Sequence, residues 1–507
     1  MTQTSDKTAG ANRRIEFLFW IMAVAGCVVV LQLLNLQVLR QSFYREKAQK
    51  MHLSTVKQQV GRGTIFDRNG KKVAESISAG SVYICPPEIR EKNRAAALLS
   101  RELDLPLHVV MKKINSRNGF EYIKRKIDFE KADKILSHGI RGIYAQTEQK
   151  RFYPLGRAAA HITGFSGMDN NGLEGTELYY EKLLRGKTGR LQIRRDAKQR
   201  PVIINTTDIK KAEKGADLYL TIDSQVQYSA QAELDAAAEK YRAKAGSIIV
   251  MNPNNGAIYA MANYPSYDPN NMEGFGPESR KNRAVTDIYE PGSTFKIFPM
   301  SLYIREFKDA DSQKVFCGNG AYEFFGRTVH DHEKHGWLTF DEVIKYSSNI
   351  GMVNLGLKVP QEKLYREFVN FGFGRPTRID MPHEPSGILR HYKEWDNISL
   401  TSIPYGQEVA VTPIQMARAY AVIANGGFLI TPHIVERAEK NGKVIYRAGK
   451  EKPVRVLGEK ECERLSRMLV GVTDKDGSGK KAVITGYTVA GKTGTAQKHN
   501  EKGRGYA

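Results

Sequence analysis

Cysteine is scarce in this sequence. It has four cysteines and no Cys-x-x-Cys pair. This number and spacing exclude a disulfide framework and give no sign of a zinc cluster. Cys27 lies in an apolar segment, so an odd number of thiols remains outside it. One disulfide among Cys85, Cys317 and Cys462 is compatible with the sequence, but three unlinked thiols are the simpler interpretation.

Acidic residues are also in deficit. The 507 residues include 55 Asp and Glu against 77 Lys and Arg, which gives a formal net charge of +22. Such a charge favours anionic partners, with nucleic acid as the first candidate. Internal repeats and low-complexity tracts are lacking, which argues against a solenoid. The length allows two to four domains and a large core.

Long apolar runs are lacking except for one near the N-terminus. Phe17 to Leu39 is apolar apart from one glycine and three amide side chains, and it is long enough to span a bilayer. Basic residues precede it, so the positive-inside rule places residues 1–14 in the cytoplasm and the rest outside. No small-x-small cleavage site follows, which favours a retained anchor at 15–39. This anchor argues against nucleic acid as the partner, and a buried core helix is the less favoured alternative.

The segment after the anchor contains no catalytic cluster. Gln41 to Val60 is polar with a few apolar positions, which predicts a helical stalk. Asn69-Gly70 predicts a hairpin with a type I′ turn. Short helical and strand-like patches then alternate, which predicts an α+β module over residues 40–215, here called the pedestal.

Residues 216–507 carry stronger secondary-structure signals. Asp223 or Ser224 is expected to cap a long helix that reaches about Lys244. Gly246–Met251 and Ala257–Met261 predict a second hairpin around Asn255-Gly256. Two capping boxes predict further helix starts: Thr339-Phe-Asp-Glu342 and Thr412-Pro-Ile-Gln415.

A hydroxyl and an amine lie three residues apart in Glu290-Pro-Gly-Ser293-Thr-Phe-Lys296. If a helix begins here, Ser293 lies at its positive N-terminus, and Lys296 lies on the same face, where a desolvated amine can act as the base. Pro299 conflicts with a straight helix, so either the helix bends there or its start is displaced. Alone, a Ser-x-x-Lys pattern is more often an exposed serine and a solvated lysine.

Two further motifs follow in separate elements, which makes the set specific. The helix from Asp341 is expected to end in Tyr346-Ser347-Ser348-Asn349, and the strand-like Tyr487–Ala490 runs into Gly491-Lys492-Thr493-Gly494-Thr495. The order Ser-x-x-Lys, Ser-x-Asn, Lys-Thr-Gly is a stated pattern of penicillin-binding proteins and class A β-lactamases.

On these motifs the sequence resembles the class B penicillin-binding proteins, most of all the cell-division type (penicillin-binding protein 3). Over nearly the whole chain other segments resemble the same family: Arg62–Gly70, Gly172–Gly175, Asn263–Asn270 and Tyr405–Gln407 with Thr412-Pro413. The resemblance implies an α+β multidomain fold with one transmembrane helix, a dimerisation-like pedestal and a penicilloyl-serine transferase α/β domain. Only fifteen residues follow Lys492, where the family has more strands and a closing helix, so this domain is expected to be C-terminally incomplete. The alternatives are a fragmentary sequence and a chain that truly ends at Ala507, which is expected to be unstable and poorly active.

The resemblance also implies roles for the motif residues. Ser293 would attack the penultimate D-Ala carbonyl of a stem peptide, and Lys296 would take its proton. Ser347 would relay a proton to the departing D-Ala. Asn349 would hold Lys296 and the substrate backbone.

The Lys-Thr-Gly segment is expected to bind the substrate's charged end. Lys492, Thr493 and Thr495 offer a cation and hydroxyls to the terminal carboxylate. The backbone N–H groups of Ser293 and Thr495 would form the oxyanion hole beside Gly494.

No metal or organic cofactor is implied. The implied partners are stem peptides, the lipid-linked precursor, the membrane, a lipid-linked peptidoglycan polymerase and other division proteins, but no nucleic acid. The net charge suits anionic headgroups and the precursor's pyrophosphate. The implied location is the bacterial cytoplasmic membrane with the catalytic domain outside. An elongation or sporulation role, a β-lactam receptor or hydrolase, and a non-catalytic scaffold stay open.

Two other patterns in the sequence suggest a nucleotide site and a metal site, and neither is favoured. Gly486 to Thr493 fits the P-loop pattern, but a P-loop must open a helix, and the residues after Lys492 lack helical character. His330, His332 and His335 with Asp331 fit no strong ligand spacing, so a solvated loop is favoured over a metal site.

Overall fold

The computed structural model describes residues 5–45, 53–58, 60–195, 201, 202, 212–307, 310, 312–449 and 451–496. The chain divides into two compact units. The first contains residues 1–60 and 187–213, and the second contains residues 61–186 and 214–507.

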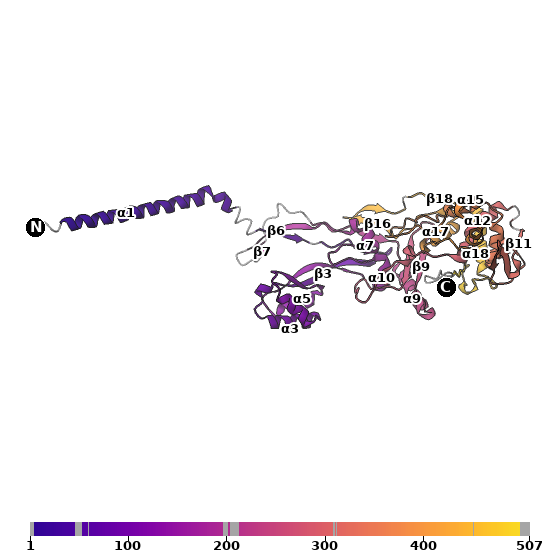
Figure 1. The fold of residues 1–507 in the computed structure, drawn as a ribbon, viewed down its shortest axis with the longest axis horizontal. Coiled ribbons are helices and arrows are strands. Elements are labelled where there is room, and N and C mark those ends of the chain that lie inside the picture. Colours follow the sequence, from indigo (N-terminus) through magenta and orange to yellow (C-terminus); the bar gives the residue numbers. More distant parts are fainter. Residues whose placement is uncertain are drawn as a thin grey trace. The chain divides into compact units, whose positions relative to one another are not determined.

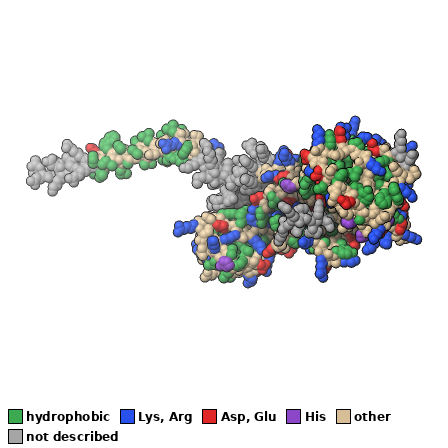
Figure 2. Space-filling view, turned by 45° about the vertical axis from the view of Figure 1, so that its right-hand side comes forward, with side chains coloured by type: hydrophobic (Ala, Val, Ile, Leu, Met, Phe, Trp, Pro, Cys, Tyr) green, Lys and Arg blue, Asp and Glu red, His purple; other side chains and the backbone are tan. Residues whose placement is uncertain are grey.

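The first unit contains a long apolar helix. α1 (Ser5–Leu34) continues into the π-helical turn η1 (Asn35–Leu39). Ile15–Leu39 has a mean hydropathy of 2.5 over its most apolar window, and none of that window is buried. Figure 2 shows hydrophobic side chains along this helix. Within the described residues it is the one helix long and apolar enough to cross a membrane, in agreement with the predicted anchor.

The first unit also contains a small sheet that the sequence did not predict. β1 (Leu53–Gln58) pairs antiparallel with β6 (Gly189–Arg195), which pairs with β7 (Pro201–Val202). The predicted helical stalk is therefore wrong for residues 53–58, and residues 46–52 and 59 lie outside the described part. The strand is stabilised by a partner far along the chain, which local composition does not reveal.

The second unit is built around a seven-stranded mixed sheet in the order β17-β16-β8-β2-β3-β4, with β5 also paired to β3. β2 and β8 are parallel, and the other pairs are antiparallel. The sheet therefore joins strands from before and after residue 216. The strands are β2 (Ile65–Phe66), β3 (Lys72–Ile84), β4 (Glu121–Ile127), β5 (Ile143–Phe152), β8 (Asp217–Leu220), β16 (Val435–Lys440) and β17 (Lys443–Arg447).

The pedestal helices pack on the β3–β5 end of this sheet. Buried leucine, isoleucine, valine and alanine side chains form one core between them, and these elements lie together in Figure 1. These helices are α3 (Lys92–Leu103), α4 (Leu107–Ile114) and α5 (Phe129–Ser137). The short helices α6 (Ala160–Thr163) and α8 (Glu181–Leu184), with α7 (Gly175–Tyr179) between them in the chain, follow β5, and α6 and α8 contribute to a second core with residues of β2, β8 and β16. Together with the mixed sheet they confirm the predicted α+β class.

The first predicted hairpin forms, but its turn is of another type. Of the two central residues only Gly70 has a positive φ, of 82°. A type I′ turn needs a positive φ at both. Instead the Asp67 carboxylate accepts the N–H groups of Asn69 (2.9 Å) and Lys71 (2.8 Å), and this side chain fixes the turn.

A buried ion cluster joins Arg62, in one of the segments that carry the family resemblance, to β5, α7 and α8. Arg62 Nη2 lies 2.6 Å from Glu177 Oε2, and Arg151 Nε lies 2.6 Å from Glu177 Oε1. Arg62 also pairs with Glu181 at 2.6 Å. Glu177 is fully buried, so its charge depends on these two guanidinium groups.

The rest of the second unit is mostly helical and has its own large hydrophobic core. Its longer helices are α9 (Ser224–Tyr241), α12 (Ile297–Glu306), α14 (Asn349–Gly356), α15 (Gln361–Asn370), α17 (Pro413–Ala424) and α18 (Glu459–Val472). Its shorter helices are α10 (Pro277–Arg280), α11 (Arg283–Thr286), α13 (Phe340–Lys345) and α16 (Asn397–Ser402). Its strand pairs are β9 (Gly246–Met251) with β10 (Ile258–Tyr264), β11 (Lys314–Phe316) with β14 (Trp337–Thr339), β12 (Ala321–Phe324) with β13 (Arg327–His330), and β15 (Phe428–Leu429) with β18 (Val454–Arg455).

The local signals in this region are confirmed. Asp223 caps α9, and the helix ends at Tyr241, three residues before the predicted end. β9 and β10 form the second predicted hairpin. Both capping boxes have their two reciprocal hydrogen bonds, at Thr339 and at Thr412. The four cysteines are free.

Candidate active site

Ser293 lies in a single 3₁₀ turn, η4 (Gly292–Phe295), directly before α12. The sequence predicted Ser293 at the N-terminus of an α-helix. Its hydroxyl lies instead one turn before the α-helix begins. Pro299 is the third residue of α12, where backbone N–H groups have no partner within the helix. The displaced helix start is thus the correct alternative, and Pro299 causes no kink.

Close backbone contacts fix this turn. Gly292 donates its N–H to the carbonyl of Gly406 over 3.0 Å. A Cβ at Gly406 would lie 2.2 Å from the Gly292 oxygen, so only glycine fits there. A Cβ at Gly494 would lie 2.7 Å from Thr294 Cγ2. The Lys-Thr-Gly segment therefore packs directly on the turn that carries Ser293.

Lys296 is fully buried. Its Nζ donates to the carbonyl and, over 3.2 Å, to the hydroxyl of Ser347. Burial lowers the pKa of Lys296 well below its usual value, and the nearby charge of Lys492 lowers it further, while Asp331 acts in the opposite direction. A neutral amine is the form that can accept a proton. Within the described part of the chain no hydrogen bond joins the side chains of Lys296 and Ser293, although the Lys296 backbone N–H donates to the Ser293 carbonyl over 3.4 Å.

Lys492 reaches the same hydroxyl from the other side. Its Nζ donates to Ser347 Oγ over 2.9 Å and to the carbonyl of Thr493 over 3.0 Å. Burial lowers the pKa of Lys492 to about 8. Ser347 therefore lies between two amines, and the positive charge of Lys492 suits an anionic substrate group.

Ser347 occupies a break between two helices. α13 ends at Lys345 and α14 begins at Asn349, so the Ser-x-Asn motif does not end one helix as predicted. Ser347 has a backbone φ of 60°, in the left-handed region that residues other than glycine rarely adopt. Ser348 caps α14 by accepting the N–H of Gly351. Asn349 Nδ2 donates to the carbonyl of His330 over 2.8 Å, and no described hydrogen bond joins Asn349 to Lys296.

The Lys-Thr-Gly segment is extended but is not a strand. Residues 488–496 have no regular secondary structure, contrary to the prediction. A strand needs a neighbour for its backbone groups, and no strand lies beside this segment in the described residues. It is held instead by the end of α18. The Gly491 N–H donates to the Leu469 carbonyl over 3.1 Å, and the Thr473 hydroxyl donates to the Val489 carbonyl over 2.7 Å. No helix follows within the described residues, so nothing in the segment supports a P-loop.

The motif residues meet in a cleft of about 560 Å³. Of the predicted site residues it is lined by Ser293, Ser347, Asn349, Thr493, Gly494 and Thr495. Lys296 and Lys492 reach it through Ser347. The cleft is also lined by residues that the sequence analysis missed: His332, Glu333, Tyr346, Asp476, Gly477, Ser478 and Lys480.

Tyr346 links two of these missed segments. Its ring stacks on His335 at 4.6 Å between centroids, and its hydroxyl donates to Asp476 over 3.1 Å. The histidine loop therefore lines the cleft, and its His330 and His332 are exposed, in line with the solvated loop that the sequence favoured over a metal site. Its Asp331 carboxylate accepts hydrogen bonds from the start of α14. No short-range pattern identifies these contacts, because each partner comes from another part of the chain.

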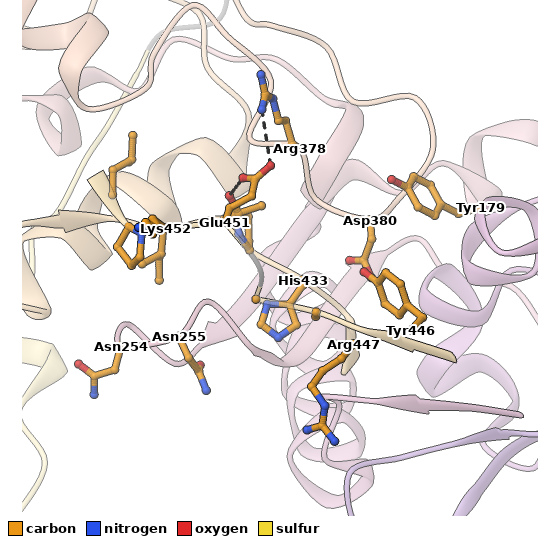
Figure 3. Close-up of a pocket in the computed structure, with 17 residues that line it drawn as sticks. Tyr179, Asn254, Asn255, Arg378, Asp380, His433, Tyr446, Arg447, Glu451 and Lys452 are labelled. Carbon is orange, nitrogen blue, oxygen red and sulfur yellow. Dashed lines mark hydrogen bonds and ion pairs between the residues drawn. The ribbon is translucent and has the colours of Figure 1, made fainter. Parts of the chain in front are cut away.

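A second cavity, of about 410 Å³, contains none of the motif residues (Figure 3). The buried Asp380 carboxylate in its wall accepts N–H groups from Ile434 (2.6 Å) and Val435 (2.8 Å). Arg378 lies 3.6 Å from Glu451 across the cavity. The acidic groups of this cavity are thus already paired within the protein.

The cleft defines the class of protein. The cleft combines a serine beside a buried lysine, a second serine between two amines, and the Lys-Thr-Gly segment packed on the turn that carries Ser293. These are the parts of a serine acyltransferase with an amine as its base. Comparison with known families agrees. The penicillin binding protein transpeptidase domain matches residues 246–507, and the penicillin-binding protein dimerisation domain matches residues 57–220. The chain belongs to the penicillin-binding protein transpeptidase family, and the expected family, fold and enzyme class are confirmed.

Individual relatives agree over most of their length. Stage V sporulation protein D of Bacillus subtilis (strain 168) is 34% identical over 86% of this chain and 69% of its own. Peptidoglycan D,D-transpeptidase FtsI of Escherichia coli (strain K12) is 30% identical over 98% of this chain and 85% of its own. The crystal structure of a peptidoglycan synthetase from Bifidobacterium adolescentis ATCC 15703 has a TM-score of 0.68 at 25% identity and covers 89% of this chain and 87% of that one.

Proposed function

We propose that this protein is a serine D,D-transpeptidase that crosslinks peptidoglycan stem peptides through an acyl-enzyme on Ser293. The observation that carries the proposal is the pair of hydrogen bonds that Ser347 Oγ accepts from Lys296 and Lys492, beside the cleft that Ser293 lines. A buried neutral amine, a relay hydroxyl and a cation are the groups that acyl transfer to and from a serine needs.

In the acylation step, Ser293 Oγ attacks the carbonyl carbon of the penultimate D-Ala, and its proton passes to the neutral Lys296. As the peptide bond breaks, Ser347 Oγ gives its proton to the leaving D-Ala nitrogen and recovers one from Lys296. The amine of a second stem peptide then attacks the ester, which forms the crosslink and returns a proton to Ser293. The N–H groups of Ser293 and Thr495 are proposed to hold the oxyanion.

The substrate carboxylate is proposed to bind the Lys-Thr-Gly side of the cleft. Thr493 and Thr495 line the cleft, and Lys492 supplies the cation. Gly494 brings this backbone against the nucleophile turn. Asn349 also lines the cleft and is proposed to bind the substrate backbone.

We propose that the protein crosses the bacterial cytoplasmic membrane once, at residues 15–39. Residues 1–14 lie in the cytoplasm, and both the pedestal (40–215) and the transpeptidase domain (216–507) lie outside. The apolar helix and the basic residues before it support this topology. Partners are a lipid-linked peptidoglycan polymerase and other division proteins, with septal synthesis as the role. The relative named for sporulation makes a sporulation role the second candidate.

Labelling membranes with a fluorescent penicillin tests the catalytic proposal. We expect one covalent label per chain, on a tryptic peptide that contains Ser293. Ser293→Ala should abolish labelling and change the free energy of unfolding by less than about 1 kcal/mol, because it replaces a small hydroxyl. Ser386→Ala removes an exposed hydroxyl and is the matched control, which should label normally. An adduct on another peptide would overturn the proposal, and rapid release of the label would show a β-lactam hydrolase instead.

A further inference from the structure

Asp331 holds the start of α14 from outside the three motifs. It directly follows β13, and its own N–H donates to the carbonyl of Gly320 over 3.1 Å, which anchors its backbone. Its Oδ1 accepts the N–H groups of Asn349 (2.5 Å) and Ile350 (3.0 Å). Its Oδ2 accepts the hydroxyl of Ser348.

These bonds complete the N-terminus of α14. The first N–H groups of a helix have no partner within it and need one from elsewhere. Asp331 accepts the first two, and Ser348 Oγ accepts the third, from Gly351, over 2.9 Å. Because Ser348 also donates to Asp331, one carboxylate fixes the whole first turn.

The residue that precedes this turn is the strained Ser347. Its φ of 60° is unfavourable for serine, so the surrounding structure must hold it. Ser348 and Asn349, its next two neighbours, are both fixed by Asp331. The carbonyl of His330, next to Asp331, fixes the Asn349 amide as well. Without these contacts the chain at Ser347 is free to leave the left-handed region.

We propose that Asp331 is a positioning residue of this active site: it holds Ser347 in reach of Lys296 and Lys492, and it holds Asn349 at the cleft. This inference rests on the proposed acyl transfer through Ser293. It adds a fourth segment, between β13 and β14, to the three motifs.

The charge of Asp331 also acts on the buried amine. The charged groups around Lys296 are Lys492, whose cation lowers the Lys296 pKa, and Asp331, which raises it. Cys317 lies near Asp331 and Glu342, and burial raises the pKa of its thiol to about 11, so it stays neutral. Removal of the Asp331 charge therefore lowers the Lys296 pKa further, and the neutral amine persists to lower pH.

Two substitutions separate position from charge. Asp331→Asn keeps the volume and can keep the acceptor for the α14 N–H groups, whereas Asp331→Ala removes both. Asp223→Asn is the matched control: Asp223 accepts two helix N–H groups and one side-chain amide, as a cap of α9, and it does not line the cleft. The measurement is the second-order rate of acylation by a penicillin from pH 5 to 10, with the melting temperature of each variant.

We expect Asp331→Ala to slow acylation about tenfold to hundredfold, because a displaced catalytic group costs rate even when it is not removed. We expect Asp331→Asn to move the acid limb of the pH profile to lower pH. Asp223→Asn should lower the melting temperature without either effect. Two results together would overturn the inference. The acid limb of the pH profile would stay at the wild-type pH in Asp331→Asn, and the loss of acylation rate would be no larger than in Asp223→Asn. If the wild-type protein takes no label at all, the proposed function fails instead.

Discussion

The ammonium group of Lys492 lies 2.9 Å from the hydroxyl of Ser347, and the amine of Lys296 lies 3.2 Å from the same oxygen. Two like charges this close repel each other, so one amine tends to be neutral. Lys296 is the more deeply buried, and the charge of Lys492 is a further cause of its lowered pKa. The arrangement thus suits the proposed division of roles, with Lys296 as the base and Lys492 as the cation.

Lys492→Ala should reduce acylation far more than it reduces stability. Loss of a charge-assisted contact to the substrate carboxylate costs about 2 to 3 kcal/mol, which is about a hundredfold in rate. The lost cation no longer lowers the pKa of Lys296, so the acid limb of the pH profile should move to higher pH, opposite to Asp331→Asn. Acylation kinetics between pH 5 and 10 measure both effects. Lys481→Ala, at an exposed position, is the control, and a near-normal rate in folded Lys492→Ala would remove Lys492 from the site.

Lys296→Met should abolish acylation while it stabilises the protein at neutral pH. The folded-state pKa of Lys296 is lowered, so the unfolded chain binds more protons and stability rises with pH between the folded and unfolded pKa values. Each unit of pKa shift corresponds to about 1.4 kcal/mol. A buried methionine carries no cost of losing a proton, so Lys296→Met should raise the free energy of unfolding at pH 7. This gain should shrink as the pH approaches the ordinary lysine pKa of about 10.4.

Thermal melts at pH 7 and pH 10 check this expectation, with Lys358→Met at an exposed lysine as the control. A lower melting temperature of Lys296→Met at pH 7 would show that the amine stabilises the fold and is not an unfavourable buried group.

Glu177→Gln should destabilise the pedestal strongly. Glu177 is fully buried between Arg62 and Arg151, and loss of its charge removes the carboxylate that pairs with Arg151 and one of the two that pair with Arg62. Breaking a buried ion pair typically costs about 3 to 5 kcal/mol. Urea unfolding followed by circular dichroism measures the change. Glu75→Gln breaks the exposed pair with Lys72 and should cost less than about 1 kcal/mol. Equal effects of the two substitutions would contradict the structural role of the buried cluster.

Several features were fixed by short stretches of sequence. Thr339 and Thr412 cap their helices with partners three residues away, and Asp223 caps α9 with the next residues along the chain. The apolar segment 15–39 and the three motifs were also readable, because length, composition and spacing carry these signals. In each cap the interacting groups lie within one element, and each motif is a run of neighbouring residues.

Tertiary structure decided the features whose partners are distant in sequence. β1 is a strand because it pairs with β6. The Lys-Thr-Gly segment is not a strand because it packs on α18 and has no strand beside it in the part of the chain that the structure describes. Asp331 was not recognised because its acceptor role exists only when α14 lies against it. The lowered pKa of Lys296 likewise follows from burial and from Lys492, almost 200 residues away in the sequence. A residue's own neighbours determine its local conformation, but packing between distant segments determines its solvation and hence its chemistry.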